Sequence, residues 1–289
     1  MKSYPVSREI ARMSGSNFYL SFFFLPREKR NGILAIYAFS RLVDDAVDEA
    51  PSEEEARRQI DFWRSRLNIC FHGGVITTKD TIFHPVLPEF SDTIRRFKIP
   101  EKYFSDLLLG VEMDLTKKRY ETFSELETYC YHVAGTIGLL CNHLFGVSEE
   151  KGRDYALLLG TAFQLTNIIR DVGSDARRGR IYIPREEWTR FGLTETDILE
   201  GKSSKPFLNL MRFQAERAES YFQKAFEALS EEQRRKIIPA EIMAAFYHTL
   251  LQKLQKERFP VFEKKVALSK WKKLKLVIRA LRRSRGTSP

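Results

Sequence analysis

The chain has 289 residues, 43% of them hydrophobic and 30% charged, which is ample for a large buried core. The sequence contains no internal repeat and no low-complexity tract, which excludes a protein of either kind. Its three cysteines, Cys70, Cys130 and Cys141, have neither an even count nor the spacing of metal ligands, so we expect a reducing compartment rather than a disulfide framework. The formal charge of +10 is compatible with a polyanionic substrate, with anionic lipid or with nucleic acid.

Apolar residues recur at helical spacing along nearly the whole chain, and strand-like alternation is nowhere sustained. We therefore predict an all-α protein. No Pro/Gly/Ser-rich linker divides the sequence, which favours a single domain over residues 1–289. The predicted helices are, in chain order, 27–48, 51–70, 86–97, 101–119, 123–146, 149–175, 185–190, 206–229, 231–257 and 266–283. Residues 72–81 are predicted as a loop, and 176–205 as a less regular stretch that contains the short helix at 185–190.

The first predicted helix ends in an acidic motif in which Asp44 and Asp48 lie four residues apart. On a helix this spacing stacks both carboxylates on one face, where like charges repel. Tyr37 and Arg41 precede them on the same stripe. A single pair of this kind is commonly just a solvated helix face, so the motif alone would not identify a site.

A second, similar motif lies at the end of the helix predicted over 149–175. Asp171 and Asp175 are again four residues apart, and Gln164 and Asn167 precede them on one stripe of an otherwise apolar helix. Such polar groups are costly to bury unless a partner satisfies them. Mg²⁺ takes one or two carboxylates and fills its other positions with water and substrate phosphate. The two motifs together favour two helices that face each other across a Mg²⁺-diphosphate site.

A basic loop, Arg178 to Tyr182, follows the second motif directly. Its guanidinium groups suit phosphate, and Gly179 lets the backbone approach a ligand closely. The small residues of 133–138 permit either close helix packing or room for a long apolar substrate, and the sequence does not separate the two. Aromatic residues suited to line an apolar cavity and stabilise a cation, or to fill the core, are Phe18, Phe22, Tyr37, Tyr129 and Tyr131.

The segment 264–285 is strongly basic, with apolar residues interleaved at near-helical spacing. This pattern is typical either of an amphipathic helix on an anionic membrane surface or of a helix that packs on the core and has a solvated charged face. No signal peptide and no apolar run of membrane-spanning length is visible. We expect a cytoplasmic protein, with peripheral contact at the inner face of the membrane left open and no nucleic-acid partner, because no supporting motif accompanies the charge.

Several motifs occur together and in order: SGSNFY (14–19), YAFSRLVDDAVD (37–48), EMDL (112–115), YCYHVAGTIG (129–138) and QLTNIIRDVG (164–173). In this combination the chain resembles the squalene/phytoene synthase family, the head-to-head prenyl synthases. The EMDL, RGR (178–180) and VALSK (266–270) segments are most similar to the bacterial presqualene diphosphate synthases of hopanoid biosynthesis. The resemblance implies a helical isoprenoid-synthase bundle around a central cavity.

The resemblance also implies a function and roles for individual residues. Two farnesyl diphosphate molecules would condense to presqualene diphosphate with release of diphosphate. Two or three Mg²⁺ ions would be held, with the diphosphates, by Asp44, Asp48, Asn167, Asp171 and Asp175. The substrates would be bound by Phe18, Phe22, Arg41, Tyr129, Gln164, Asn167, Arg170, Arg180 and Tyr182. The catalytic residues would be the four aspartates together with Tyr37 and Arg41. Many relatives carry a glutamate where this chain has Ser174, which on a helix points away from the Asp171/Asp175 stripe.

Three alternatives stay open. A phytoene or dehydrosqualene synthase of carotenoid biosynthesis would differ in chain length or in the second reaction step. A squalene synthase would need NADPH, for which the sequence has no GxGxxG motif, although a reductase step need not use that motif. A non-catalytic, basic membrane-binding helical protein would explain the tail but not the two acidic motifs.

Overall fold

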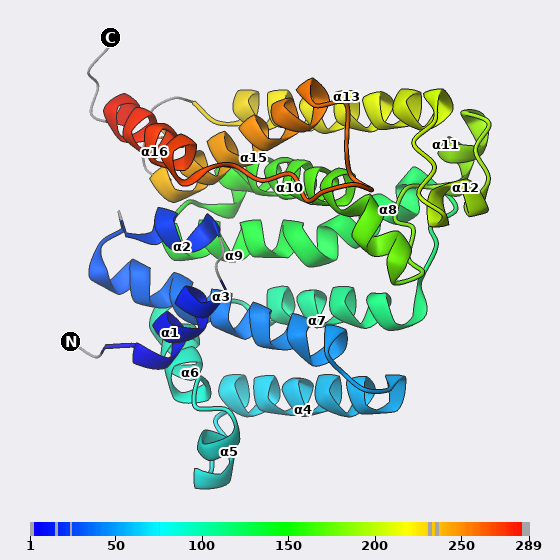
Figure 1. Ribbon diagram of the computed structural model, residues 1–289. Coiled ribbons are helices and arrows are strands. Elements are labelled where there is room, and N and C mark those ends of the chain that lie inside the picture. Colours follow the sequence, from blue (N-terminus) through cyan, green and yellow to red (C-terminus); the bar gives the residue numbers. More distant parts are fainter. Residues whose placement is uncertain are drawn as a thin grey trace. The chain divides into compact units, whose positions relative to one another are not determined.

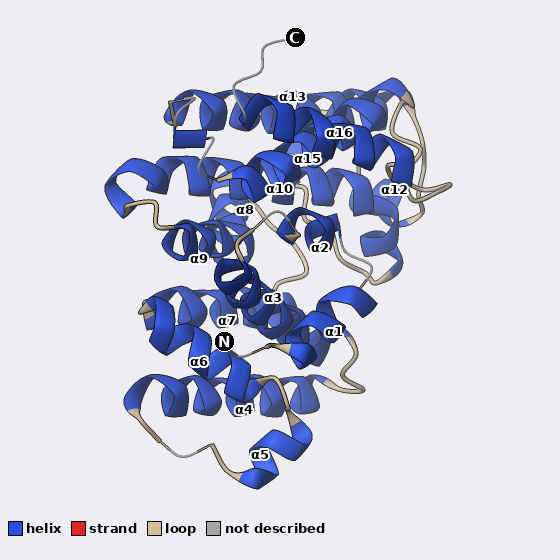
Figure 2. Cartoon of the chain, turned by 90° about the vertical axis from the view of Figure 1, so that its left-hand side faces the viewer, coloured by secondary structure: helices blue, strands red, loops and turns tan. Residues whose placement is uncertain are grey.

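The computed structural model describes residues 3–14, 17–23, 25–74, 76–230, 233–234 and 237–284. Within these residues every regular element is a helix, and the only β-type pairing is an isolated bridge between Arg119 and Ile181 (Figure 2). The predicted all-α class is therefore confirmed. No helix in the described part of the chain combines the length and the apolar character needed to cross a membrane.

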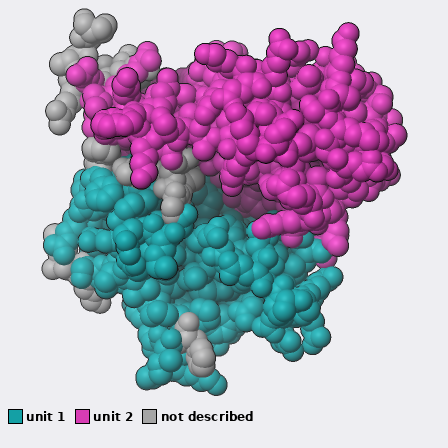
Figure 3. Space-filling model, viewed as in Figure 1, with its two compact units in different colours: residues 1–115, 136–153 teal, residues 116–135, 154–289 magenta. Residues whose placement is uncertain are grey.

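The chain forms two compact units, coloured separately in Figure 3. Unit 1 consists of residues 1–115 and 136–153, and unit 2 of residues 116–135 and 154–289. Because each unit takes two separate stretches of the chain, the division follows no linker in the sequence. The single domain over 1–289 stays a prediction.

Unit 1 is organised around α3 (Arg27–Asp48), which packs against α1, α4, α6 and α9 (Figure 1). Its other helices are α1 (Pro5–Met13), α2 (Asn17–Phe22), α4 (Glu53–His72), α5 (Thr78–Phe83), α6 (Leu87–Phe97), α7 (Glu101–Thr116) and α9 (Thr136–Phe145). At the centre Phe39 is fully buried and stacks on Phe90, with ring centroids 4.4 Å apart. Trp63 and Phe104 meet Phe39 edge-on. This aromatic core fixes α3, and with it the first acidic motif.

Unit 2 contains α8 (Phe123–Cys130), a π-helical turn η1 (Tyr131–Gly135), most of α10 (Glu149–Arg177), α11 (Arg185–Arg190), α12 (Glu195–Leu199), α13 (Lys205–Ala228), α15 (Ile238–Lys256) and α16 (Lys270–Ser284). A buried ion pair links α11 to α13: Glu187 accepts hydrogen bonds from Arg217 and, at 2.6 Å, from Gln214. α15 packs against both α13 and α16.

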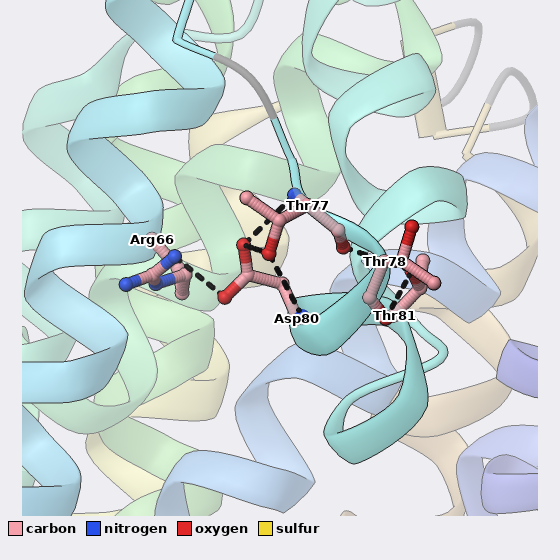
Figure 4. A network of polar contacts seen from close by, with 5 residues as sticks. All are labelled: Arg66, Thr77, Thr78, Asp80 and Thr81. Atoms are coloured by element: carbon pink, nitrogen blue, oxygen red, sulfur yellow. Dashed lines mark hydrogen bonds and ion pairs between the residues drawn. The ribbon is translucent and has the colours of Figure 1, made fainter.

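Most predicted helices agree with the structure to within a few residues, and α3 and α11 match exactly. The loop predicted over 72–81 is wrong in its second half, because α5 begins at Thr78. A capping box starts it: Thr77 accepts from the Asp80 backbone, and the Asp80 carboxylate accepts from the Thr77 backbone and hydroxyl (Figure 4). Arg66 of α4 donates to the same carboxylate at 2.6 Å and so connects α5 to α4.

Other boundaries also differ from the prediction. Helices α1, α2 and α12 are short and were not predicted, since so few turns carry little periodicity. The helix predicted over 266–283 begins only at Lys270. The helix predicted over 123–146 is continuous but becomes π-helical at Tyr131–Gly135. Short π-helical turns are rare in proteins overall, and those that occur are often found at functional sites.

Candidate active site

The first acidic motif lies on the last turns of α3, in unit 1. Asp44 and Asp48 are exposed, while the residue before each of them, Val43 and Val47, is buried, so the carboxylates line the solvent-facing side of a well-anchored helix. Arg41 pairs with Asp45 at 2.5 Å, which leaves Asp45 beside the predicted stripe rather than on it. The structure thus brings Arg41, Asp44 and Asp48 together on one helix, as predicted.

Tyr37 connects this stripe to the N-terminal helices. Its hydroxyl donates to the Oγ of Ser14 at 2.9 Å, and its ring meets that of Phe22 edge-on at 6.2 Å. Phe22 is only 4% exposed. Of the predicted aromatic residues, Tyr37 and Phe22 therefore pack against each other. Phe18 is on α2, but its side chain lies outside the described residues.

Asp44 has an environment unlike that of an ordinary surface aspartate. Displacement of water by the surrounding protein, together with repulsion from Asp114 and against the opposing effect of Arg41, raises the pKa of its carboxyl to about 7. Its side chain nevertheless reaches solvent, so it is crowded but accessible. A cation would relieve this crowding. Asp114, on α7 within the EMDL motif, was not predicted as a site residue; only the fold brings it beside Asp44.

The second acidic motif lies on α10, in unit 2, with each of its polar side chains partly buried. Arg170 donates from Nε to one Asp171 oxygen at 2.8 Å and contacts the other oxygen as well. Burial opposes the charge of Arg170, but the bonds to Asp171 raise its pKa. The hydroxyl of Ser174 donates to the Asp171 carbonyl at 2.8 Å, so Ser174 bonds its own helix and adds nothing to the acidic stripe.

The amide side chains of the stripe are incompletely satisfied. The Nδ2 group of Asn167 donates to Gln164 over a long 3.4 Å. The Asn167 Oδ1 atom is buried and accepts no hydrogen bond in the part of the chain that the structure describes. An orphaned amide oxygen one turn before two carboxylates is a set of hard oxygen donors, which fits Mg²⁺.

The basic loop is fixed directly to the end of α10. The Asp175 carbonyl accepts from the backbone of Arg178 at 3.0 Å and of Arg180 at 2.9 Å. Gly179, with φ of 70°, supplies the left-handed residue that ends the helix. The side chains of Asp175, Arg180 and Tyr182 then line one small apolar cavity of about 10 Å³, room for roughly one water molecule.

Three tyrosines pack together at the end of this loop in what is called the tyrosine stack below, with the rings of Tyr182 and Tyr120 stacked and that of Tyr129 tilted. Tyr182 lies 5.2 Å from Tyr129 of α8 and 5.8 Å from Tyr120, between ring centroids. Tyr129 and Tyr182 were predicted as substrate-binding residues and are brought together; Tyr120, which is 1% exposed, was missed. Nothing in the sequence around Tyr120 signals its position. Tyr131 lies at the start of η1 and is not part of the stack.

Two of the small residues of 133–138, Ala134 and Gly135, pack closely against α10. A side chain at Gly160 of α10 would meet the Ala134 carbonyl oxygen at 2.8 Å, and one at Gly135 would meet Leu157 at 3.0 Å. At Ala134 and Gly135 the structure therefore shows close helix packing.

The chain between α15 and α16 crosses α10 within the second motif. A Cβ at Gly173 would lie 2.2 Å from the carbonyl oxygen of Val261. Phe262 is held in turn by Phe207 of α13, with ring centroids 4.7 Å apart. This segment, residues 257–269, is called the strap below. Only a glycine allows the strap to lie directly on the turn between Asp171 and Asp175.

Each motif offers two aspartates, and no cluster of three or more His, Cys, Asp or Glu residues poised for a metal occurs among the described residues. This donor set suits Mg²⁺, which uses few protein carboxylates and completes its shell with water and phosphate. Arg41 and Arg180 add cationic groups beside the two motifs. The helical fold and the donor sets are those expected of a prenyl-diphosphate synthase of the all-α class.

Comparisons with known proteins give the family. Residues 11–272 match the squalene/phytoene synthase family, and the chain belongs to it. A phytoene synthase from Arthrospira platensis is 35% identical over 285 residues, covering 94% of this chain and 90% of that protein. A 15-cis-phytoene synthase from Synechococcus elongatus is 34% identical, with the same coverage of both chains.

Solved structures agree with this fold. A dehydrosqualene synthase in complex with ligand has a TM-score of 0.83 and 30% identity, covering 98% of this chain and 97% of that one. The squalene synthase HpnC from Alicyclobacillus acidocaldarius has a TM-score of 0.79 and 25% identity, covering 89% and 94%. The isoprenoid-synthase helical fold implied by the sequence motifs is thereby confirmed.

Proposed function

We propose that the protein is a Mg²⁺-dependent synthase that joins two prenyl diphosphates head to head to a hydrocarbon of the phytoene type, with geranylgeranyl diphosphate as substrate. The observation that carries this is the similarity to phytoene synthases at 34–35% identity over 94% of the chain. These relatives favour the carotenoid alternative over the presqualene diphosphate expected from the sequence motifs.

A second candidate product is presqualene diphosphate, formed from two farnesyl diphosphates. The likeness to the squalene synthase HpnC and the EMDL motif favour it. Both candidates begin with the same cyclopropyl coupling and differ in chain length and in the second step. NADPH is needed in neither, because phytoene forms by proton loss and presqualene diphosphate keeps its diphosphate.

The residues of the two motifs would act on the diphosphates. Bound Mg²⁺ would neutralise the leaving diphosphate as the allylic C–O bond breaks, with Asp44, Asp48, Asn167, Asp171 and Asp175 holding the ions. Asp171 is engaged by Arg170 in the structure. Binding a cation at Asp171 would free that guanidinium for a phosphate oxygen.

The organic part of the reaction needs shelter from water. Ionisation leaves an allylic cation, which the double bond of the second chain attacks, and loss of one proton closes the cyclopropane ring. Aromatic faces such as those of Tyr129 and Tyr182 suit stabilisation of such a cation. We propose a substrate-binding role for both rings, together with Phe22.

The test is incubation of the full chain with equal concentrations of geranylgeranyl and farnesyl diphosphate, with Mg²⁺ and without NADPH, followed by analysis of the products. Phytoene supports the proposal. Presqualene diphosphate from the shorter substrate would replace it with the second candidate. No diphosphate release from either substrate would overturn both.

Matched variants test the site. Asp48→Asn and Asp171→Asn should each lower turnover at least about a hundredfold, because each removes a charge that the ions require. Asp61→Asn, on the exposed face of α4, is the control and should leave turnover unchanged. Circular dichroism should be the same for all three. Near-normal turnover in Asp48→Asn or Asp171→Asn would contradict the assignment.

A further inference from the structure

Helix α16 exposes a row of large apolar side chains. Trp271, Leu274 and Ile278 are 76%, 49% and 41% exposed. Their spacing places all three within about 60° of one another on the helix surface, because an α-helix turns once in 3.6 residues. We call these three residues the Trp271 stripe.

The stripe extends beyond the face by which α16 packs onto the rest of unit 2. That face contains Val277, which is 5% exposed, and it rests on α15 (Figure 1). The preceding residues are anchored too, since Val266 is buried and Lys253 of α15 donates to the Ala267 carbonyl at 2.7 Å. A helix that needed only to cover the core would have no use for this additional exposed apolar surface.

Positive charge borders the stripe. All the ionisable side chains of α16 are Lys or Arg, and no Asp or Glu follows Glu263 in the sequence. Lys275, Arg279 and Arg282 are exposed, and their helical positions follow directly on one side of the stripe. On the packed side, burial and then the neighbouring Lys270 lower the pKa of Lys273.

We propose that α16 binds a membrane surface containing anionic lipid, with the Trp271 stripe in the interface and the bordering cations on lipid phosphates. The complementarity of charge selects an anionic partner, and the apolar stripe selects a lipid over a nucleic acid, which would contact only the cations. Tryptophan is the side chain that bilayer interfaces favour most clearly. Binding does not depend on which product the protein makes.

Flotation with vesicles tests the proposal on the full chain. Wild type should bind vesicles of phosphatidylcholine with phosphatidylglycerol and bind those of phosphatidylcholine alone far more weakly. Trp271→Ser/Leu274→Ser/Ile278→Ser should lose about tenfold or more in affinity. Lys275→Gln/Arg279→Gln should lose about fivefold per charge. The matched controls, Ile82→Ser and Arg57→Gln/Arg58→Gln, alter exposed residues of α5 and α4 and should bind as wild type.

Tryptophan fluorescence gives a direct readout, because Trp63 and Trp188 are 1% and 6% exposed whereas Trp271 is open to solvent. Emission should shift to the blue on binding, and brominated lipids should quench it. Three results would overturn the proposal: no binding by wild type, unchanged binding by the stripe variant, or a protein dimer that the stripe variant abolishes without any vesicle binding. If the protein bound RNA as tightly as anionic vesicles, and the stripe variant bound RNA as tightly as wild type, α16 would instead be a general polyanion-binding surface.

Discussion

Gly173→Ala tests how the strap fixes the second acidic motif. The added Cβ would lie 2.2 Å from the Val261 carbonyl oxygen, about 1.2 Å short of the 3.4 Å at which ordinary contact begins. In an open helix the change would add about 1 kcal/mol of stability. Overpacking costs about 1–3 kcal/mol, and the upper part of that range, about 2–3 kcal/mol, applies here because the obstructing atom is backbone, which cannot rotate aside. We expect a net loss of about 1–2 kcal/mol in the free energy of unfolding.

The same overlap should affect function, because relieving it moves either the strap or the turn that carries Asp171 and Asp175. The Mg²⁺ concentration for half-maximal diphosphate release should rise severalfold. Gly160→Ala is the matched control: it also meets a backbone oxygen, at 2.8 Å, but lies about 20 Å away along α10.

The measurements are urea unfolding and Mg²⁺ titration of diphosphate release. Gly160→Ala should lose stability while keeping the wild-type Mg²⁺ requirement. If Gly173→Ala is more stable than wild type by about 1 kcal/mol and titrates normally with Mg²⁺, the strap does not press on the helix and the reasoning fails.

Three further predictions concern single groups. Asn167→Leu removes the orphaned oxygen and should raise the Mg²⁺ requirement about tenfold with unchanged circular dichroism; an unchanged titration would rule Asn167 out as a ligand. Bonds from Thr77 and the nearby Arg66 lower the pKa of Asp80, so its stabilisation is present above the ordinary aspartate pKa and is lost as pH falls through the lowered value. The difference in urea midpoint between wild type and Asp80→Asn should therefore shrink in acid, and a constant difference would contradict this. Glu187→Ala leaves the charge of Arg217 without its partner and should lower the free energy of unfolding, measured in urea, by about 3 kcal/mol. A loss under about 1 kcal/mol would show that the ion pair does not stabilise the fold.

The sequence predicted the long helices well because their apolar periodicity extends over many turns. The bounds of α3 were predicted exactly, since Pro26 precedes its first residue and Pro51 follows soon after its last. Short helices depend on local capping instead, as at Thr77 and Asp80, where the predicted loop is partly helical. The helix propensities of residues 131–135 do not predict the π-helical turn η1, because the residue inserted there is stabilised by packing.

For the site, the sequence by itself determined which groups share a helix face, because the spacing of Asp44 and Asp48, or of Asn167, Asp171 and Asp175, fixes their alignment. Only the tertiary structure decided what lies beside them. Asp114 reaches Asp44 from another helix, Tyr120 joins the tyrosine stack, and the strap crosses Gly173. Such neighbours come from distant parts of the chain, and the packing of side chains, not any local pattern, brings them together.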